Sequence, residues 1–153
     1  MNYYYKLVIF LLINFGALWL GSFLQGEGAR SSWYQSLELA PWTPPGWAFG
    51  VAWVSIMICF SFFMAYAADL RSLSFVLLLF ILQFILNVSW NAIFFRYHFV
   101  GAGLVVILLL TIITGFFVFW GIKHLQWKTL LVLPYFIWLL LAISLNWYTW
   151  IRN

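Results

Sequence analysis

Long apolar runs separated by isolated charged residues dominate the chain. Because an ionisable side chain costs about 2.5–3.5 kcal/mol at the middle of a membrane-spanning helix, we treat the charges as boundaries. This pattern predicts spans at about residues 7–24, 47–68, 72–95, 99–122 and 129–151. Each run has about 18–24 residues, which matches a hydrocarbon core of roughly 30 Å. The runs do not alternate between apolar and polar residues, so they predict helices and not the strands of a membrane barrel.

The predicted fold is therefore an all-α integral membrane bundle of five transmembrane helices, in one domain over residues 1–153. Hydrophobic residues make up 67% of the chain and charged residues 7%, whereas a soluble domain needs roughly 25% charged residues. This composition excludes soluble enzymes, nucleic-acid-binding proteins and disordered tails. The net charge of +4 comes from dispersed cations, which favours anchoring in a lipid bilayer over binding to a polyanion.

An odd number of spans places the two termini on opposite sides of the membrane. The cations on the N-terminal side are Lys6, Arg71, Lys123 and Lys128, and those on the other side are Arg30, Arg96 and Arg152. Four cations against three favour a cytoplasmic N-terminus. The odd number of spans and the absence of an internal repeat give no support to the inverted-repeat architecture of many transporters.

Residues 25–46 form the only long connection between the predicted spans. Ser32 and Gln35 have the spacing of a capping box, which predicts a short helix through Glu38. The prolines within residues 41–45 then end that helix and stiffen the chain before the second span. Two interpretations stay open: a structured lid, or an interfacial segment whose tryptophans lie among lipid headgroups.

Few residues could carry conventional catalysis or bind a metal. The three acidic residues all fall at loops, and His98 and His124 lie in different turns on opposite faces of the membrane. Cys59 has no nearby base and is typical of a small apolar filler. We therefore expect no metal site and no required cofactor, and the same pattern weakens proton-coupled or ion-coupled transport.

Uncharged polar and aromatic side chains recur at helical spacing in the third span. Gln83, Asn87, Trp90, Asn91 and Phe94 follow the pattern i, i+4, i+7, i+8, i+11, which is one face of a helix. The amides on this face could simply bond to another helix, as is common in membrane bundles. Alternatively, the two rings form a flat wall with two amide groups beside it, which suits a large planar ligand.

The last span carries a similar stripe of Tyr135, Trp138, Ala142 and Asn146, and Trp53 lies just inside the second span. Three helices could thus direct indoles into one cavity near the long connection. The last span ends in the proposed cholesterol pattern L/V-x-Y-x-K/R. That pattern is weak evidence in a chain this rich in Leu, Val and Tyr.

The order of these motifs resembles the TspO/translocator protein family, also called tryptophan-rich sensory proteins or peripheral-type benzodiazepine receptors. The first matching stretch is Trp33-Tyr34-x-x-Leu37, then Pro41-Trp42-Thr43-Pro44-Pro45-Gly46 and Trp53. The later matches are Asn87-x-x-Trp90 with Phe94-Phe95, and Pro134-Tyr135-x-x-Trp138 with Ala142, Leu145 and Asn146. One departure is that family members often carry Lys-Pro soon after the Trp-Tyr pair, where this chain has Leu39-Ala40.

The resemblance implies a compact five-helix bundle that is commonly a homodimer. Its pocket near the first loop would accept protoporphyrin IX, haem and, in animal members, cholesterol and synthetic isoquinoline or benzodiazepine ligands. The positions that match the family's pocket are Tyr34, Pro44, Asn87, Trp90, Asn91, Phe94 and Ala142. Trp53 and Trp138 are similar to the indoles linked to light-dependent protoporphyrin breakdown, so they are candidate catalytic and ligand-binding residues. Leu145, Tyr148 and Arg152 match the family's cholesterol-recognition segment.

These features favour a membrane receptor or sensor that binds a tetrapyrrole or a sterol in an aromatic pocket. The alternatives are a light-dependent porphyrin-degrading enzyme, a tetrapyrrole or sterol transporter, and a scaffold in a membrane complex. Light-driven chemistry would need no acid or base from the protein, which agrees with the few titratable groups in the spans.

Overall fold

The computed structural model describes residues 2–70 and 73–153, and the regular structure of these residues is entirely helical. Five helical segments of this part of the chain are long and apolar enough to cross a membrane. The main helices are α1 (Tyr3–Leu24), α3 (Gly46–Ala67), α4 (Leu73–Asn91), α5 (Val100–His124) and α6 (Leu133–Arg152). The shorter elements are η1 (Gly28–Arg30), α2 (Ser32–Ser36), the π-helix η2 (Ala92–Arg96) and η3 (Gln126–Leu131). The predicted fold class is confirmed.

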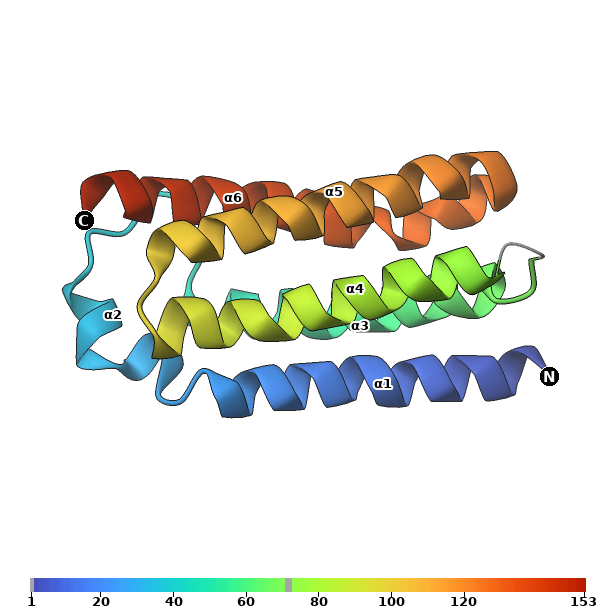
Figure 1. Cartoon of the computed structure of the whole chain (residues 1–153), viewed down its shortest axis with the longest axis horizontal. Helices are drawn as coiled ribbons and strands as arrows, with labels where there is room; N and C mark the ends of the chain where they lie inside the picture. Colours follow the sequence, from blue (N-terminus) through green and yellow to red (C-terminus); the bar gives the residue numbers. More distant parts are fainter. Residues whose placement is uncertain (1, 71–72) are drawn as a thin grey trace.

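The five long helices close into a ring. Helix α1 packs against α3 and α4, α4 packs against α5, α5 packs against α6, and α6 returns to α3. In Figure 1, α1 lies along one side of the bundle, α3 and α4 lie in the middle, and α5 and α6 lie on the other side. The termini lie at opposite ends of the bundle (Figure 1). The cytoplasmic location of the N-terminus stays a prediction.

The first helix begins earlier than the charge pattern predicts. It starts at Tyr3 and not at residue 7, because Asn2 caps it. The Asn2 side chain accepts a hydrogen bond from the Tyr4 backbone N–H at 3.2 Å. Lys6 therefore lies inside the helix, where its ammonium group pairs with Asp69. Lys6 can therefore mark the edge of the membrane although the helix continues beyond it.

The third and fifth spans are interrupted, whereas α3 and α5 match the second and fourth spans to within two residues at each end. The predicted first residue of the third span, Ser72, lies outside the described residues. Helix α4 then ends at Asn91, and the backbone continues as a π-helix through Arg96. The fifth span begins as the 3₁₀-helix η3, and α6 starts beside Pro134 because proline fits the first turn of a helix.

The short helix of the long connection is shifted from its predicted position. Ser31, and not Ser32, is its N-cap, since Ser31 Oγ accepts a hydrogen bond from the Tyr34 backbone N–H at 3.2 Å. The helix is α2, and it ends before Glu38. The predicted capping box is therefore wrong, and a single serine cap starts this helix.

An aromatic core fills the half of the bundle nearer the N-terminus. The Phe60 ring is fully buried. It lies 5.9 Å from the Phe80 ring, 5.5 Å from Phe117 and 5.3 Å from Tyr135. Because packing rather than the hydrophobic effect holds helices together in lipid, this cluster fixes one end of the ring. The cavity described below borders this core, since Ile107, Leu110 and Leu139 belong to both.

Candidate functional site

A cavity of about 680 Å³ lies inside the ring of helices. Residues of the α2 segment and of the C-terminal part of α6 line it, and Figure 1 shows both at the same end of the bundle. All five long helices and the connection between α1 and α3 contribute side chains to its lining. Its volume falls within the range of about 300–1,000 Å³ that is typical of small-molecule sites. Its position between helices of a bundle is also typical of such sites.

The structure brings the candidate ligand-binding residues together around this cavity. The lining includes Tyr34, Pro44, Trp53, Asn87, Trp90, Asn91, Phe94, Trp138 and Ala142. Of the three residues of the sterol segment, Leu145 also lines the cavity. Tyr148 and Arg152 do not line it and instead contact Glu38 of the connection between α2 and α3.

The connection between α1 and α3 is packed onto the bundle by aromatic side chains. The Trp33 ring stacks on the His98 ring, with centroids 4.0 Å apart and 11° between the planes. The Tyr34 ring lies 5.4 Å from the Phe95 ring. Trp47, by contrast, is 73% exposed and suits an anchor among lipid headgroups. Of the two interpretations of this connection, the geometry favours a structured lid.

One wall of the cavity is flat and aromatic. The Trp90 and Phe94 rings are stacked, with centroids 5.0 Å apart and 17° between the planes. Trp33 and Tyr34 hold the Phe94 ring edge-on, at 5.7 Å and 6.3 Å. Phe94 belongs to the π-helix η2, an element that is rare in proteins and concentrates at functional sites.

The indoles of Trp53 and Trp138 lie on the part of the wall formed by α3 and α6. The Trp138 ring meets the Phe49 ring edge-on at 5.3 Å, and the Trp53 ring meets the Tyr135 ring edge-on at 5.9 Å. These contacts fix the orientation of both indoles. Phe49 also lines the cavity and was missed in the sequence, where its signal is the four-residue spacing to Trp53 on one helix face.

The two amides predicted to contact a ligand, those of Asn87 and Asn91, differ in their hydrogen bonds within the protein. The Asn91 Nδ2 donates a hydrogen bond to the Asn87 backbone carbonyl at 3.1 Å, so part of this amide is occupied within its own helix. The Asn87 side chain is 6% exposed and lines the cavity. The hydrogen bonds found among residues 2–70 and 73–153 do not include its amide, and this amide is not among the fully enclosed polar atoms without a partner, so it is open to the cavity. A buried amide without a protein partner beside a cavity can bind a polar group of a ligand or a water molecule.

Asn146 joins three helices beside the same wall, a role that the sequence stripe did not show. Its Oδ1 accepts a hydrogen bond from Trp90 Nε1 at 3.2 Å, and its Nδ2 donates to the Val100 carbonyl at 2.9 Å. The side chain is 3% exposed. Asn146 therefore fixes the indole of Trp90 in the plane that stacks on Phe94.

We expect Asn146→Ala to lower the free energy of unfolding by about 1 kcal/mol, the size of an interhelical hydrogen bond in a membrane. The variant leaves the Trp90 N–H without its acceptor, so it should also weaken ligand binding. SDS titration of the solubilised protein measures the first effect. Asn14→Ala is the matched control, because Asn14 Nδ2 donates to Ser61 Oγ at 2.8 Å away from the cavity. Equal effects of both variants on ligand affinity would contradict the role of Asn146.

Helix α1 also lines the cavity, which the sequence analysis missed. Its contribution comes from Ala17, Leu18 and Ser22, and its C-cap residue Gln25 also lines the cavity. Gly21 permits the close approach, since a Cβ atom there would lie 2.7 Å from Asn91 Nδ2. The available signal was the four-residue spacing of Ala17 and Gly21, which is typical of small residues at a membrane helix contact.

The chemistry of the cavity is stacking and hydrogen bonding. Among the described residues that line it, none is Asp, Glu, Lys, Arg or His. Over the same described part of the chain, no group of three or more His, Cys, Asp or Glu side chains could hold a metal ion. Burial raises the pKa of the Tyr34 phenol above its ordinary value, so the phenol stays protonated near neutral pH. The lining thus offers aromatic faces, amides and a phenol.

The amino-acid sequence is similar to those of several known proteins. The "Tryptophan-rich protein TspO" of Archaeoglobus fulgidus is 33% identical over 150 residues, which cover 97% of each chain. "Protein CrtK" of Rhodobacter capsulatus is 34% identical over 128 residues, 80% of this chain and 79% of that protein. A "Tryptophan-rich sensory protein" of Cereibacter sphaeroides is 29% identical over 115 residues, 74% of this chain and 72% of that protein. The model of the TspO/MBR family matches residues 8–151, so the chain belongs to this family of multi-pass membrane proteins.

Proposed function

We propose that this protein is a membrane receptor or sensor that binds a planar tetrapyrrole, such as protoporphyrin IX or haem, in the cavity between its helices. One observation carries the proposal: the stacked rings of Trp90 and Phe94 lie beside the buried amide of Asn87 on one wall of a closed ring of helices. A tetrapyrrole has the complementary features, since its broad ring stacks on aromatic faces and its carboxylates accept hydrogen bonds.

The two kinds of contact would contribute differently to binding. Burial of the apolar ring against Trp53, Trp90 and Trp138 supplies most of the affinity. The amides and the Tyr34 phenol fix the orientation, because a neutral hydrogen bond adds only about 0.5–1.5 kcal/mol net. Closure of the lid over the ligand would then change the surface that the protein presents at this end of the bundle.

Asn87→Ala is expected to weaken protoporphyrin IX binding by about threefold to tenfold, the worth of one hydrogen bond. A titration of the detergent-solubilised protein in darkness, followed by quenching of tryptophan fluorescence, measures the affinity. Asn14→Ala should bind like the wild type, because Asn14 lies outside the cavity. Quenching that never saturates in the wild type would refute the proposed function. Competition by cholesterol would show that sterols share the cavity.

A second candidate function is light-dependent breakdown of the bound porphyrin. It is favoured by the presence of Trp53 and Trp138 in the lining of the same cavity, where either indole could be oxidised by an excited porphyrin. We expect illumination to remove porphyrin absorbance in the wild type, more slowly in Trp138→Phe, and not at all when Trp53→Phe and Trp138→Phe are combined, while dark binding persists in all three proteins. Binding without any loss of absorbance under light would leave the sensor as the better account. Uptake into sealed vesicles would separate transport from both.

A further inference from the structure

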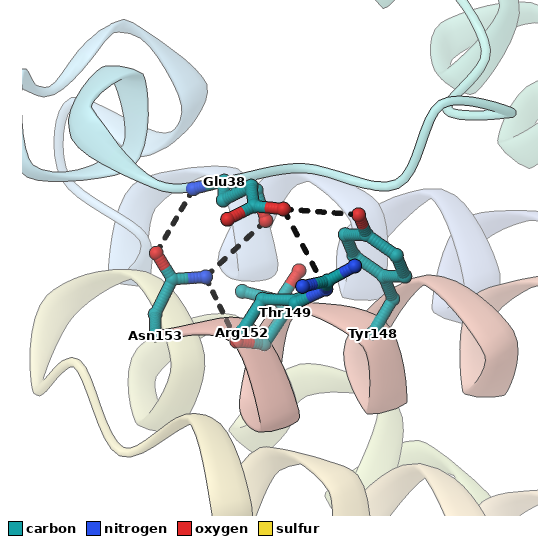
Figure 2. A network of polar contacts seen from close by, with 5 residues as sticks. All are labelled: Glu38, Tyr148, Thr149, Arg152 and Asn153. Atoms are coloured by element: carbon teal, nitrogen blue, oxygen red, sulfur yellow. Dashed lines mark hydrogen bonds and ion pairs between the residues drawn. The ribbon is translucent and has the colours of Figure 1, made fainter.

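The C-terminal end of α6 holds the connection between α2 and α3 through a polar cluster that we call the clasp: Glu38, Tyr148, Thr149, Arg152 and Asn153 (Figure 2). The Asn153 amide binds both sides of the Glu38 backbone. Its Oδ1 accepts a hydrogen bond from the Glu38 N–H at 2.9 Å, and its Nδ2 donates to the Glu38 carbonyl at 3.2 Å. The same Nδ2 donates to the Thr149 carbonyl at 2.9 Å. One side chain thus bridges the loop to the helix.

The Glu38 carboxylate forms the second part of the clasp. The Tyr148 hydroxyl donates to Glu38 Oε1 at 3.1 Å, and Arg152 Nε lies 3.6 Å from the same oxygen (Figure 2). The Glu38 and Arg152 side chains are each 55% exposed, so water and salt screen their attraction. The Asn153 contacts do not depend on charge, and they hold the backbone itself. We therefore expect Asn153 to be the stronger half of the clasp.

The clasped residue lies directly beside the lining of the cavity. Leu39, the next residue after Glu38, lines it, and so do Thr43 and Pro44 further along the same connection. Thr149, whose carbonyl accepts the Asn153 amide, lines it from α6. A displacement of Glu38 would therefore displace the wall of the cavity.

A neighbouring contact keeps the rest of this connection on α6. Trp42 Nε1 donates to Ser144 Oγ at 3.1 Å, and the Trp42 ring meets the Tyr148 ring edge-on at 5.4 Å. Tyr148 thus contacts the connection twice, once through its hydroxyl group and once through its ring. Ser144 and Tyr148 are one turn apart on α6, so their contacts with Trp42 and Glu38 join the loop to one face of this helix.

We propose that Asn153 and Glu38 are positioning residues of the ligand site, which hold residues 37–45 against α6 so that the loop closes the cavity over its ligand. This inference rests on the proposed function for the existence of a ligand. It also assigns Tyr148 and Arg152 to the retention of the loop, whereas the sequence pattern suggested sterol recognition. The clasp sets how long a ligand stays in the cavity and not which ligand enters.

The test uses Asn153→Ala in the full chain, reconstituted in lipid nanodiscs. The variant removes the bonds to Glu38, and the loss of two hydrogen bonds should raise loop opening by about tenfold or more. Hydrogen exchange of the peptide around Glu38, without ligand, should speed up by that factor. The dissociation rate of protoporphyrin IX, measured by transfer to excess serum albumin, should rise by about tenfold, because the ligand leaves while the loop is open.

Two further variants separate the parts of the clasp. Glu38→Gln keeps the backbone contacts with Asn153, so both rates should rise by no more than about threefold. Arg152→Gln should have an effect of the same size. Arg96→Gln is its matched control, since Arg96 is an exposed arginine of the same bundle end outside the clasp, and it should change neither rate.

Each hypothesis would be contradicted by a different experimental result. Unchanged hydrogen exchange in Asn153→Ala would overturn the clasp, whatever the protein binds. Faster exchange with an unchanged dissociation rate would overturn the positioning role. A wild type that shows no saturable protoporphyrin binding refutes the proposed function instead. If Arg152→Gln weakens binding of cholesterol while exchange around Glu38 stays at the wild-type rate, the sterol role is right and the assignment of Arg152 to the clasp is wrong.

Discussion

Ala142→Phe is expected to weaken protoporphyrin IX binding at least about a hundredfold, or about 2.8 kcal/mol, while leaving the bundle folded. Ala142 lies on α6 one turn from Trp138 and one turn from Asn146, and all three line the cavity. A phenyl ring at this position has the cavity of about 680 Å³ to extend into. It would occupy the space in which a planar ligand stacks. The substitution should therefore lower the affinity for the ligand without the overpacking that destabilises a filled core.

The matched control is Ala102→Phe, because Ala102 is an exposed alanine of α5 outside the cavity lining. It adds the same ring at a position that faces the lipid, and its affinity should equal that of the wild type. Circular dichroism during heating should show a comparable unfolding temperature for both variants. Wild-type affinity in a folded Ala142→Phe protein would place the ligand elsewhere and would refute the cavity as its site.

The fold could be predicted from the sequence because the solvent is lipid. An apolar run that crosses the hydrocarbon core must satisfy its backbone internally, so long apolar runs become helices. The ends of the helices follow other rules. The cap at Asn2 starts α1 before Lys6, and Pro134 starts α6 after the 3₁₀-helix η3. No pattern of hydrophobic residues distinguishes the π-turn at η2 from a continuing α-helix, so the end of α4 at Asn91 could not be predicted.

The candidate site was predictable along each helix and not between helices. The helical period of the predicted third span places Asn87, Trp90 and Phe94 on one face, and in the structure these residues of α4 and η2 line the cavity. The period says nothing about which partner an amide finds. Asn91 turns back to its own helix, whereas Asn146 reaches Trp90 across the bundle. Those choices depend on how closely neighbouring helices approach, which is a property of the packed bundle.

Gln83 and Tyr135 form a polar pair in the buried core. Variants of this pair can measure how much the stability depends on the partner that a buried amide finds in the packed bundle. Gln83 Nε2 donates a hydrogen bond to the Tyr135 hydroxyl at 2.7 Å, and the two side chains are 1% and 0% exposed. The Gln83 Oε1 has no partner among the described residues. Turning the amide over would let the hydroxyl donate to Oε1 and would leave the amide nitrogen unpaired. One polar end of Gln83 is therefore unsatisfied in either orientation.

Tyr135→Phe is expected to lower the free energy of unfolding by about 1–3 kcal/mol, because it leaves the whole Gln83 amide buried without a partner. Gln83→Leu should lower the free energy of unfolding by less. It leaves only the Tyr135 hydroxyl without a partner, and it also removes the amide end that has no partner in the wild type. The double variant should return close to the stability of the wild type, as both polar groups are then absent. SDS titration of all four proteins gives this cycle, and strictly additive losses would contradict it. Protoporphyrin affinity should stay constant throughout, because Phe keeps the ring whose edge supports Trp53 at 5.9 Å.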